Sequence, residues 1–324
     1  MDILEKIRNF IKQFDFEPII ENKENFVYLN KFLICGMGGS HLAGDYLKFL
    51  FPEIDIYIHK DYELPNINDL YDRLIIVISY SGETEESISS FQEALNKKLN
   101  LITISKNGKL LNLSKENKIP YIQLPEDENL PRLAVGYMIK ALFKIINDEL
   151  NVRSYYIERE IDIKEIENKS QLLAEEIGSK IFLIYTTEYL YPLAYYWKIM
   201  FNENTKHPVF LNCLPELCHN EIEIFENEKF YKNFFVLFLN ATEFIKEKNK
   251  KRIEILKSLL EERKIKNKII NFPSKERLII AVKNILTAGF TSYYLSKLKN
   301  IDPVNNYLIE EFKNKMAHFK TDFI

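Results

Sequence analysis

The chain has 324 residues, of which 46% are hydrophobic and 28% charged, and its formal net charge is -3. This is the composition of an ordinary globular protein with enough apolar residues for one large domain or two average ones. The acidic balance argues against a nucleic-acid-binding surface, and no apolar run predicts a membrane span. We therefore expect neither nucleic acid nor membrane as a partner. Three cysteines are too few for a disulfide framework, which predicts a cytoplasmic protein.

In the first half of the chain, short runs rich in Ile, Val and Leu alternate with helical patterns. Residues 1–14 predict an amphipathic helix, and later helices are predicted over residues 42–50, 84–96 and 129–150, the last with Pro131 in its first turn. Strands are predicted over residues 31–37, 54–60, 73–80 and 100–106. Continuous apolar strands separated by helices are typical of a parallel sheet buried on both faces.

The same pattern begins again after residues 151–169, a charged stretch without strand signals. A helix to residue 178 precedes strands predicted over residues 180–186, 208–212, 233–240 and 264–272. Helices are predicted over residues 190–204, 243–262, 274–298 and 303–320. We therefore expect an α/β protein with two doubly wound parallel-sheet domains, residues 1–150 and 151–324, the second with an extra C-terminal helix.

A glycine-rich turn follows the first predicted strand. The segment "CGMGGS" at residues 35–40 leads into a helix, where open α/β sheets bind ligands. Bare backbone lets a ligand approach closely, and free N–H groups at a helix start favour anions. The segment has neither the third glycine of G-x-G-x-x-G nor the Gly-Lys-Ser/Thr of a P-loop. A tight turn without a ligand remains the alternative.

A second polar turn, "SYSGETEES" at residues 79–87, follows the third predicted strand. It places the hydroxyls of Ser79, Ser81 and Thr84 around Gly82, next to the free N–H groups of a helix start. A phosphate monoester would find hydroxyl donors, backbone donors and the positive end of a helix dipole there. A capping box is the alternative for this turn alone, but two such turns at successive strand ends favour a ligand site.

These turns, "GMGGSHLAGD" and "SYSGETEES", resemble the sugar isomerase (SIS) domain, a phosphosugar-binding α/β fold. The segment "WKIMFNENTKHPVFLNCLPELCHNEI" at residues 197–222 is similar to the bifunctional phosphoglucose/phosphomannose isomerase family, which shows Trp-Lys, Asn-Glu-Asn-x-Lys-x-Pro and Pro-Glu-Leu-x-His-Asn-Glu-Ile. "SYYLSKLKNIDPVNNYLIEEFKNKM" resembles the closing segment of that family. The resemblance extends from residue 32 to residue 316.

The resemblance implies a cofactor-free isomerase that interconverts glucose 6-phosphate, and mannose 6-phosphate, with fructose 6-phosphate through an enediol. It implies that Arg132 stabilises the enediolate and that Glu203 moves the proton, and it assigns ring opening to His219 and Lys313. It implies a homodimer in which His219 reaches the site of the neighbouring subunit. The substrate-binding residues that it implies are Ser79, Ser81 and Thr84 for the phosphate and Gly38, Gly39 and Ser40 for the sugar. His41 and Cys218 depart from the family pattern.

Without the family motif, little in the sequence distinguishes Glu203, Arg132, His219 and Lys313 from other charged residues. A base for this reaction needs a partly desolvated carboxylate, and Glu203 ends an aromatic-rich helix, but it is one of 47 acidic residues. Without the motif, a surface ion pair explains Arg132 equally well, and a plain structural or surface role is favoured for His219. Lys315 competes with Lys313.

Three other functions stay open as hypotheses. Cys213, Cys218 and His219, with His207 nearby, offer metal ligands, but their spacing lacks the compact pairs of a structural zinc site, so we expect no metal. A non-catalytic phosphosugar-binding regulator would need a partner or DNA-binding element, and none is evident. The isomerase part of glucosamine-6-phosphate synthase follows a glutaminase that opens with a nucleophilic cysteine, whereas residue 2 here is Asp.

Overall fold

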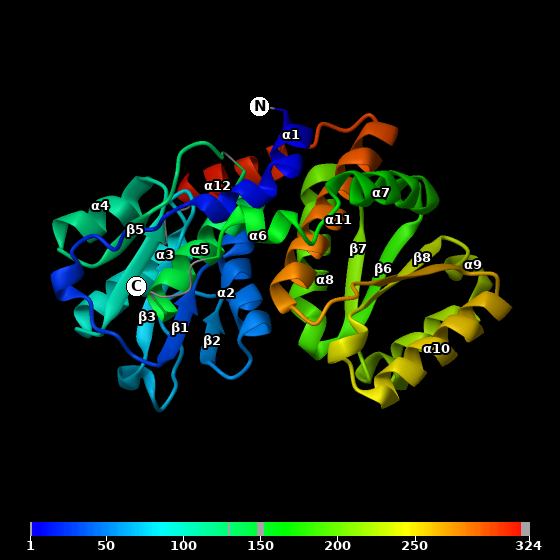
Figure 1. The fold of residues 1–324 in the computed structure, drawn as a ribbon, viewed down its shortest axis with the longest axis horizontal. Helices are drawn as coiled ribbons and strands as arrows, with labels where there is room; N and C mark the ends of the chain where they lie inside the picture. Colours follow the sequence, from blue (N-terminus) through cyan, green and yellow to red (C-terminus); the bar gives the residue numbers. More distant parts are fainter. Residues whose placement is uncertain (1, 129, 148–151, 319–324) are drawn as a thin grey trace.

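The computed structural model describes residues 2–128, 130–147 and 152–318, and it contains two sheets side by side (Figure 1). The strand order is β2-β1-β3-β4-β5 in the first sheet and β7-β6-β8-β9 in the second, and all paired strands are parallel. The strands are β1 (Lys31–Cys35), β2 (Asp55–His59), β3 (Leu74–Ile78), β4 (Leu101–Ser105), β5 (Tyr121–Gln123), β6 (Ile181–Thr187), β7 (Val209–Leu214), β8 (Phe234–Asn240) and β9 (Lys266–Asn271).

Helices connect successive strands and pack on the sheets. The α-helices are α1 (Ile3–Arg8), α2 (Gly38–Leu50), α3 (Glu85–Asn96), α4 (Gly108–Glu116), α5 (Val135–Ile146), α6 (Ser154–Glu158), α7 (Ile163–Ile177), α8 (Tyr191–Thr205), α9 (Glu228–Tyr231), α10 (Glu247–Glu262), α11 (Arg277–Leu298) and α12 (Tyr307–His318). The 3-10 helices are η1 (Phe10–Asp15), η2 (Lys23–Asn25), η3 (Leu70–Asp72), η4 (Pro131–Leu133), η5 (Glu188–Leu190), η6 (Glu216–His219), η7 (Glu221–Glu226) and η8 (Thr242–Phe244).

Both faces of the first sheet are buried, which explains its continuous apolar strands. Along β1, Phe32 and Ile34 belong to the large core shared with the second half of the chain. The alternate residues Leu33 and Cys35 pack in a smaller core with Phe91 of α3. Alternation of side chains along a strand sends successive residues to opposite faces, so helices must cover both. The predicted fold of two doubly wound parallel sheets is confirmed.

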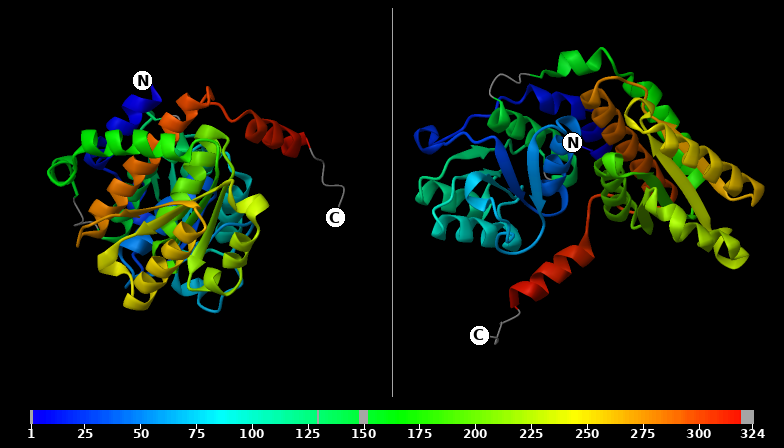
Figure 2. Two further views of the ribbon diagram at one scale, coloured as in Figure 1. Left: turned by 90° about the vertical axis from the view of Figure 1, so that its right-hand side faces the viewer. Right: turned by 90° about the horizontal axis from the view of Figure 1, so that it is seen from below.

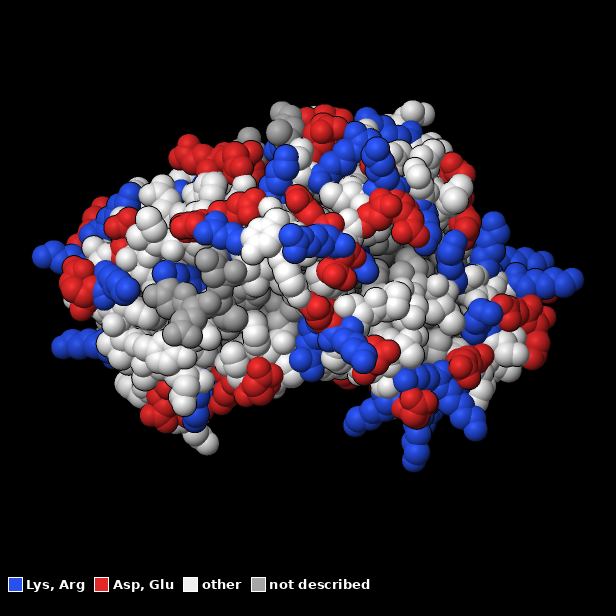
Figure 3. All heavy atoms as spheres, viewed as in Figure 1, with Lys and Arg blue, Asp and Glu red and all other residues white. Residues whose placement is uncertain are grey.

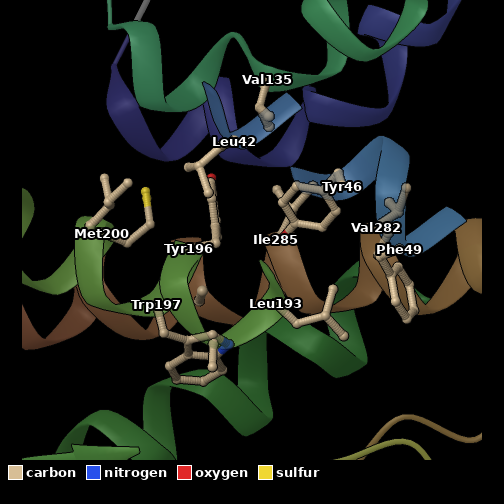
Figure 4. Packing of buried hydrophobic residues seen from close by; sticks show 14 of the residues in the cluster. Leu42, Tyr46, Phe49, Val135, Leu193, Tyr196, Trp197, Met200, Val282 and Ile285 are labelled. Atoms are coloured by element: carbon tan, nitrogen blue, oxygen red, sulfur yellow. The ribbon is translucent and has the colours of Figure 1, made fainter. Parts of the chain in front are cut away.

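The two halves meet in an apolar core formed by α2 and α5 from the first half and α8 and α11 from the second (Figure 4). Three buried polar groups cross this core. The indole of Trp197 donates to Asn284 Oδ1 over 2.8 Å, and Asn284 Nδ2 donates to the Tyr46 hydroxyl over 2.9 Å. Because buried polar groups are costly unless paired, these bonds fix how α2 sits against α8 and α11.

Within the described ranges, one helix, α11, is long and apolar enough to cross a membrane. Such a segment was not predicted from the sequence. Inside the protein, however, 78% of its apolar window is buried. It packs against α7 and α8, so its hydrophobicity is accounted for by the core.

Most predicted elements match, and the differences are local. Neither β5 nor α4 was predicted. The single helix expected over residues 129–150 is wrong, because η4 holds Pro131 and Ala134 separates it from α5. Residues 129 and 148–150 of that prediction lie outside the described residues. The domain boundary near residue 150 stays a prediction.

α12 projects from the body of the protein (Figure 2). It begins at Tyr307, four residues later than predicted, and residues 319–320 of the predicted helix lie outside the described residues. Several of its apolar side chains are exposed, including Tyr307, Leu308 and Phe312.

Candidate functional site

Two loops follow neighbouring strands at the point where the strand order of the first sheet reverses. β1 lies between β2 and β3, so the connections that leave β1 and β3 go to opposite faces. Such a switch point at the carboxyl ends of parallel strands is where open α/β sheets bind ligands. The glycine turn follows Cys35 and the hydroxyl-rich turn follows Ile78, so the structure brings the two predicted turns to one edge.

The glycine turn lies against η4. A Cβ atom on Gly39 would lie 3.1 Å from the carbonyl carbon and oxygen of Pro131, so only glycine allows this approach without a shift. Gly38 begins α2, and the buried hydroxyl of Ser40 accepts a hydrogen bond from the Tyr80 amide over 3.1 Å. Ser40 therefore joins the first turn to the second, and Gly39 joins it to the residue before Arg132.

The hydroxyl-rich turn is internally bonded at the start of α3. Ser79 Oγ donates to Thr84 Oγ1 over 2.9 Å and accepts from the Gly82 amide over 3.1 Å. Ser81 Oγ accepts from the Glu83 amide over 3.3 Å. Gly82 has φ +74°, the left-handed region that suits glycine. The three hydroxyls thus gather where the helix dipole is positive, an arrangement suited to an oxyanion.

Arg132 and Glu203 contact each other although they belong to different halves of the chain. Arg132 Nη1 donates to Glu203 Oε2 over 2.8 Å, joining η4 to the last turn of α8. The Arg132 side chain is 2% exposed and that of Glu203 24%. A carboxylate that is reachable but partly desolvated meets the requirement for a proton-transferring base.

The other two nitrogens of Arg132 also donate hydrogen bonds. Its Nε donates to Asn204 Oδ1 over 2.7 Å, and its Nη2 donates to the carbonyl oxygen of Pro303 over 2.7 Å. Asn204 is itself buried and donates to Ser292 Oγ over 2.9 Å. Burial lowers the pKa of Arg132, although Glu203 acts in the opposite direction. A guanidinium so held can present charge to a ligand without reorienting.

The other two predicted catalytic residues are not brought to this pair within one chain. His219 is exposed at the end of η6, and Lys313 lies on the projecting α12, where its ammonium is 3.4 Å from Glu310. Lys315, the alternative, pairs with Glu311 over 2.6 Å. No hydrogen bond or ion pair within the described ranges joins any of the three to Arg132 or Glu203.

His41 and the cysteines lie apart from these contacts. The imidazole of His41 is buried, with Nδ1 2.8 Å from Asp45 Oδ2 and its ring 5.4 Å from that of Tyr195. Within the described part of the chain, His, Cys, Asp and Glu form no group of three or more that could hold a metal ion. Cys213 is buried and Cys218 partly buried, and both are free.

The sequence interpretation missed three residues that surround the pair: Asn204, Lys206 and Asn306. Asn306 Nδ2 donates to Glu203 Oε2 over 2.9 Å, and Lys206 Nζ donates to Asn306 Oδ1 over 2.9 Å. The motif Asn-Glu-Asn-x-Lys contains Asn204 and Lys206 and could have singled them out. For Asn306 no local pattern exists, because its role depends on a contact over 103 positions of sequence.

Comparison with known proteins agrees with this architecture. The SIS domain family matches residues 29–127, and the family described as bacterial phospho-glucose isomerase C-terminal SIS domain matches residues 166–316. The chain is therefore a protein of two SIS-type domains. An Escherichia coli tagatose-6-phosphate ketose/aldose isomerase structure shares the fold, with a TM-score of 0.67 and 14% identity over 93% of this chain and 94% of that one.

Curated relatives narrow the class. A bifunctional phosphoglucose/phosphomannose isomerase from Aquifex aeolicus is 28% identical over 322 residues, covering 97% of this chain and 98% of the relative. One from Caldicellulosiruptor bescii is 31% identical over 314 residues, covering 90% and 91%. The chain belongs to the bifunctional phosphoglucose/phosphomannose isomerase family.

Proposed function

We propose that the protein is an aldose–ketose isomerase that interconverts glucose 6-phosphate, and mannose 6-phosphate, with fructose 6-phosphate. The contact between Arg132 and Glu203 next to the glycine turn is the observation that carries this proposal. This pair would offer a carboxylate and a bonded cation to a sugar whose phosphate lies at the hydroxyl-rich turn. The names of the relatives support the same reaction and the same pair of aldoses.

In this proposal the substrate phosphate binds to the hydroxyl-rich turn. Ser79, Ser81 and Thr84 are assigned to the phosphate: Ser81 and Thr84 supply hydroxyl donors, and Ser79 orients Thr84 through its hydrogen bond. The first N–H groups of α3 supply backbone donors. The sugar lies along the glycine turn, with Gly38, Gly39 and Ser40 as its neighbours, because the absence of side chains at the two glycines leaves room for it. The reacting carbons then face η4 and the end of α8.

Proton transfer is assigned to Glu203. Its carboxylate takes the proton from C2 of the aldose, and the electron pair left behind forms the C1–C2 double bond of an enediolate while the C1=O π pair moves onto O1. A proton then passes from O2 to O1, the C2=O bond forms, and the same carboxyl group returns its proton to C1. Arg132 stabilises the negative oxygen of that intermediate. Since Arg132 Nη1 is bonded to Glu203 in the free site, we expect the substrate oxygen to replace the carboxylate at this donor.

Ring opening is assigned to His219 and Lys313, and we propose that His219 acts in the site of a second copy of the chain. Its exposure on η6 is compatible with such a role. We further propose that the protein is a cytoplasmic homodimer that acts in carbohydrate metabolism, in glycolysis and gluconeogenesis.

The variant Glu203→Gln tests the proposal. We expect the amide to keep the hydrogen bonds to Oε2 and the fold but to lower kcat by about 10²–10⁴-fold, the contribution of a general base. Coupled assays with all three hexose phosphates, with and without chelator, measure it. The matched control is Glu247→Gln, an exposed glutamate of α10, which should keep wild-type kcat. Turnover of Glu203→Gln close to the control would show that another group transfers the proton.

A further inference from the structure

Glu203 is held by only one of its two carboxylate oxygens. Oε2 accepts from Arg132 Nη1 over 2.8 Å and from Asn306 Nδ2 over 2.9 Å. No hydrogen bond in the described ranges uses Oε1. Because 24% of the Glu203 side chain is exposed and Oε2 already accepts two hydrogen bonds, Oε1 is the oxygen with free acceptor capacity for a ligand.

The amide of Asn306 can adopt only one orientation here. A lysine ammonium only donates and a carboxylate only accepts, so Oδ1 must face Lys206 and Nδ2 must face Glu203. The distances agree: Lys206 Nζ to Asn306 Oδ1 is 2.9 Å and Asn306 Nδ2 to Glu203 Oε2 is 2.9 Å. Flipping the amide would break both bonds. The Lys206 ammonium therefore keeps the Asn306 NH₂ group directed at the Glu203 carboxylate.

Lys206 is anchored in turn by backbone carbonyls. Its ammonium donates to the carbonyl oxygen of Asn305 over 2.7 Å and to the carbonyl oxygen of Glu203. Together with the bond to Asn306 Oδ1, these contacts use all three N–H donors of Lys206. It therefore ties the connection between α11 and α12 to the end of α8. Arg132 adds a further bond to this connection through the carbonyl oxygen of Pro303.

From this arrangement we infer that Asn306, oriented by Lys206, is a positioning residue that holds Glu203 by Oε2 and leaves Oε1 as the oxygen that takes and returns the proton. This inference rests on the proposed isomerase reaction. Asn306 keeps its hydrogen bond to Glu203 when a substrate oxygen replaces the carboxylate at Arg132 Nη1, so the base stays in place when its ion pair is broken. Such hydrogen bonds orient a reacting group in the same way that outer hydrogen bonds orient the ligands of a metal.

Two variants of Asn306 test the inference. Asn306→Leu has nearly the same size but no donor, and loss of a hydrogen bond to a charged group should lower kcat by roughly tenfold or more. Asn306→Asp keeps the acceptor for Lys206 and so the anchored connection, but turns a carboxylate toward Glu203. Its kcat should fall further than that of Asn306→Leu. In both variants we expect KM for fructose 6-phosphate within about twofold of wild type, since the phosphate cradle is untouched.

The neighbouring Asn305 is the matched control. Its side chain bonds to Asp302 and not to Glu203, so Asn305→Ala should keep kcat. A second readout uses glucose 6-phosphate deuterated at C2. A carboxylic acid that is loosely held loses its deuteron to water, so the fraction recovered at C1 of the product should fall for the Asn306 variants and stay unchanged for Asn305→Ala.

Wild-type turnover in the same assay tests the proposed reaction separately, and its absence would overturn both. With an active wild type, kcat of Asn306→Asp within twofold of Asn305→Ala, or unchanged deuterium recovery, would overturn the inference alone. Thermal unfolding of each variant shows whether a lost activity is only lost fold, because Asn306→Asp should melt close to wild type.

Discussion

Arg132 shows how a single buried cation connects the two halves of the chain. All three of its nitrogens donate, to Asn204, Glu203 and Pro303. Burying a guanidinium is unfavourable unless its donors are satisfied, so these contacts stabilise one position of the side chain. The family motif selected Arg132 and Glu203 from the sequence, but their contact spans 71 positions and no local pattern predicts it.

The hydroxyl-rich turn depends on Gly82. Its φ of +74° is costly for other residues, and a Cβ there would overlap the carbonyl oxygen of Asn107. We expect Gly82→Ala to displace the turn and raise KM for fructose 6-phosphate roughly tenfold or more, because hydroxyl donors to the phosphate lose their places. Steady-state kinetics measures this.

Gly178 provides the comparison for Gly82. It also has positive φ, +54°, but the nearest atom to its added Cβ is 3.6 Å away. Its ψ of −122° lies outside the left-handed helical region, so Gly178→Ala should cost about 1–3 kcal/mol of stability and leave KM unchanged. Equal KM values in the two variants would mean that the turn does not hold the phosphate.

At the scale of elements, the strands that were predicted have at least five residues, whether they are fully buried like β3 or largely accessible like β2. β1, β3 and β4 are continuous apolar runs and lie within the predicted ranges. β5 has three residues, too few for a periodic pattern, and α4 has only three buried residues among its nine. Such elements are stabilised by their neighbours more than by their own sequence.

α1 is joined to the second half of the chain by an ion pair. Arg8 donates through Nε and Nη2 to the two oxygens of Glu167 on α7, over 2.9 and 2.7 Å, and the Tyr294 hydroxyl donates to the same carboxylate over 2.5 Å. The hydrogen bond from Arg8 lowers the pKa of Glu167 more than burial raises it. The charged form is therefore favoured in the folded protein.

Because the pKa of Glu167 is lower in the folded state, its contribution is complete above the ordinary value of 4.5 and is lost as pH falls through the folded pKa. Glu167→Gln should reduce the free energy of unfolding at pH 7 by about 1–2 kcal/mol, and the difference from wild type should shrink below pH 4.5. Urea midpoints at several pH values measure it.

Glu165 on the same helix is the control for this prediction. Its pair with Lys169 is exposed, so Glu165→Gln should change stability by less than about 1 kcal/mol. A difference between Glu167→Gln and wild type that persists unchanged in acid would contradict the assigned cause.

At the scale of the molecule, the two sheets repeat one strand order, but their contributions differ. The first four positions of sheet one, β2-β1-β3-β4, correspond to β7-β6-β8-β9 in the second. The glycine and hydroxyl turns belong to the first half, and Glu203 and His219 belong to the second. On the face shown in Figure 3, acidic and basic side chains are interspersed, as the near-neutral charge of the sequence suggests.

The proposed exchange of His219 between two copies can be tested by mixing inactive variants. In a hybrid of Glu203→Gln and His219→Asn subunits, one site carries both changes and the other carries neither, provided that His219 acts across the interface. Random reassociation makes about half of the dimers hybrids. The mixture should then regain about a quarter of wild-type activity.

Recovery must be accompanied by a dimeric mass in solution. Each variant alone, taken through the same unfolding and refolding, serves as control and should stay inactive. If the mixture is as inactive as its components while the mass shows a dimer, His219 acts within its own subunit or not at all.

The packed core between the sheets has one more consequence. Trp197, Asn284 and Tyr46 hold α2, which starts at the glycine turn, against α8, which ends near Glu203. Ser40 on α2 also accepts a hydrogen bond from the Tyr80 amide of the hydroxyl-rich turn. In the proposed reaction, the distance between the phosphate-binding turn and Glu203 is therefore set by this core. A sugar phosphate one carbon shorter, bound by its phosphate at the same turn, would present the wrong carbon to the carboxylate. We therefore expect this core, which does not contact the substrate, to determine the length of substrate that reacts.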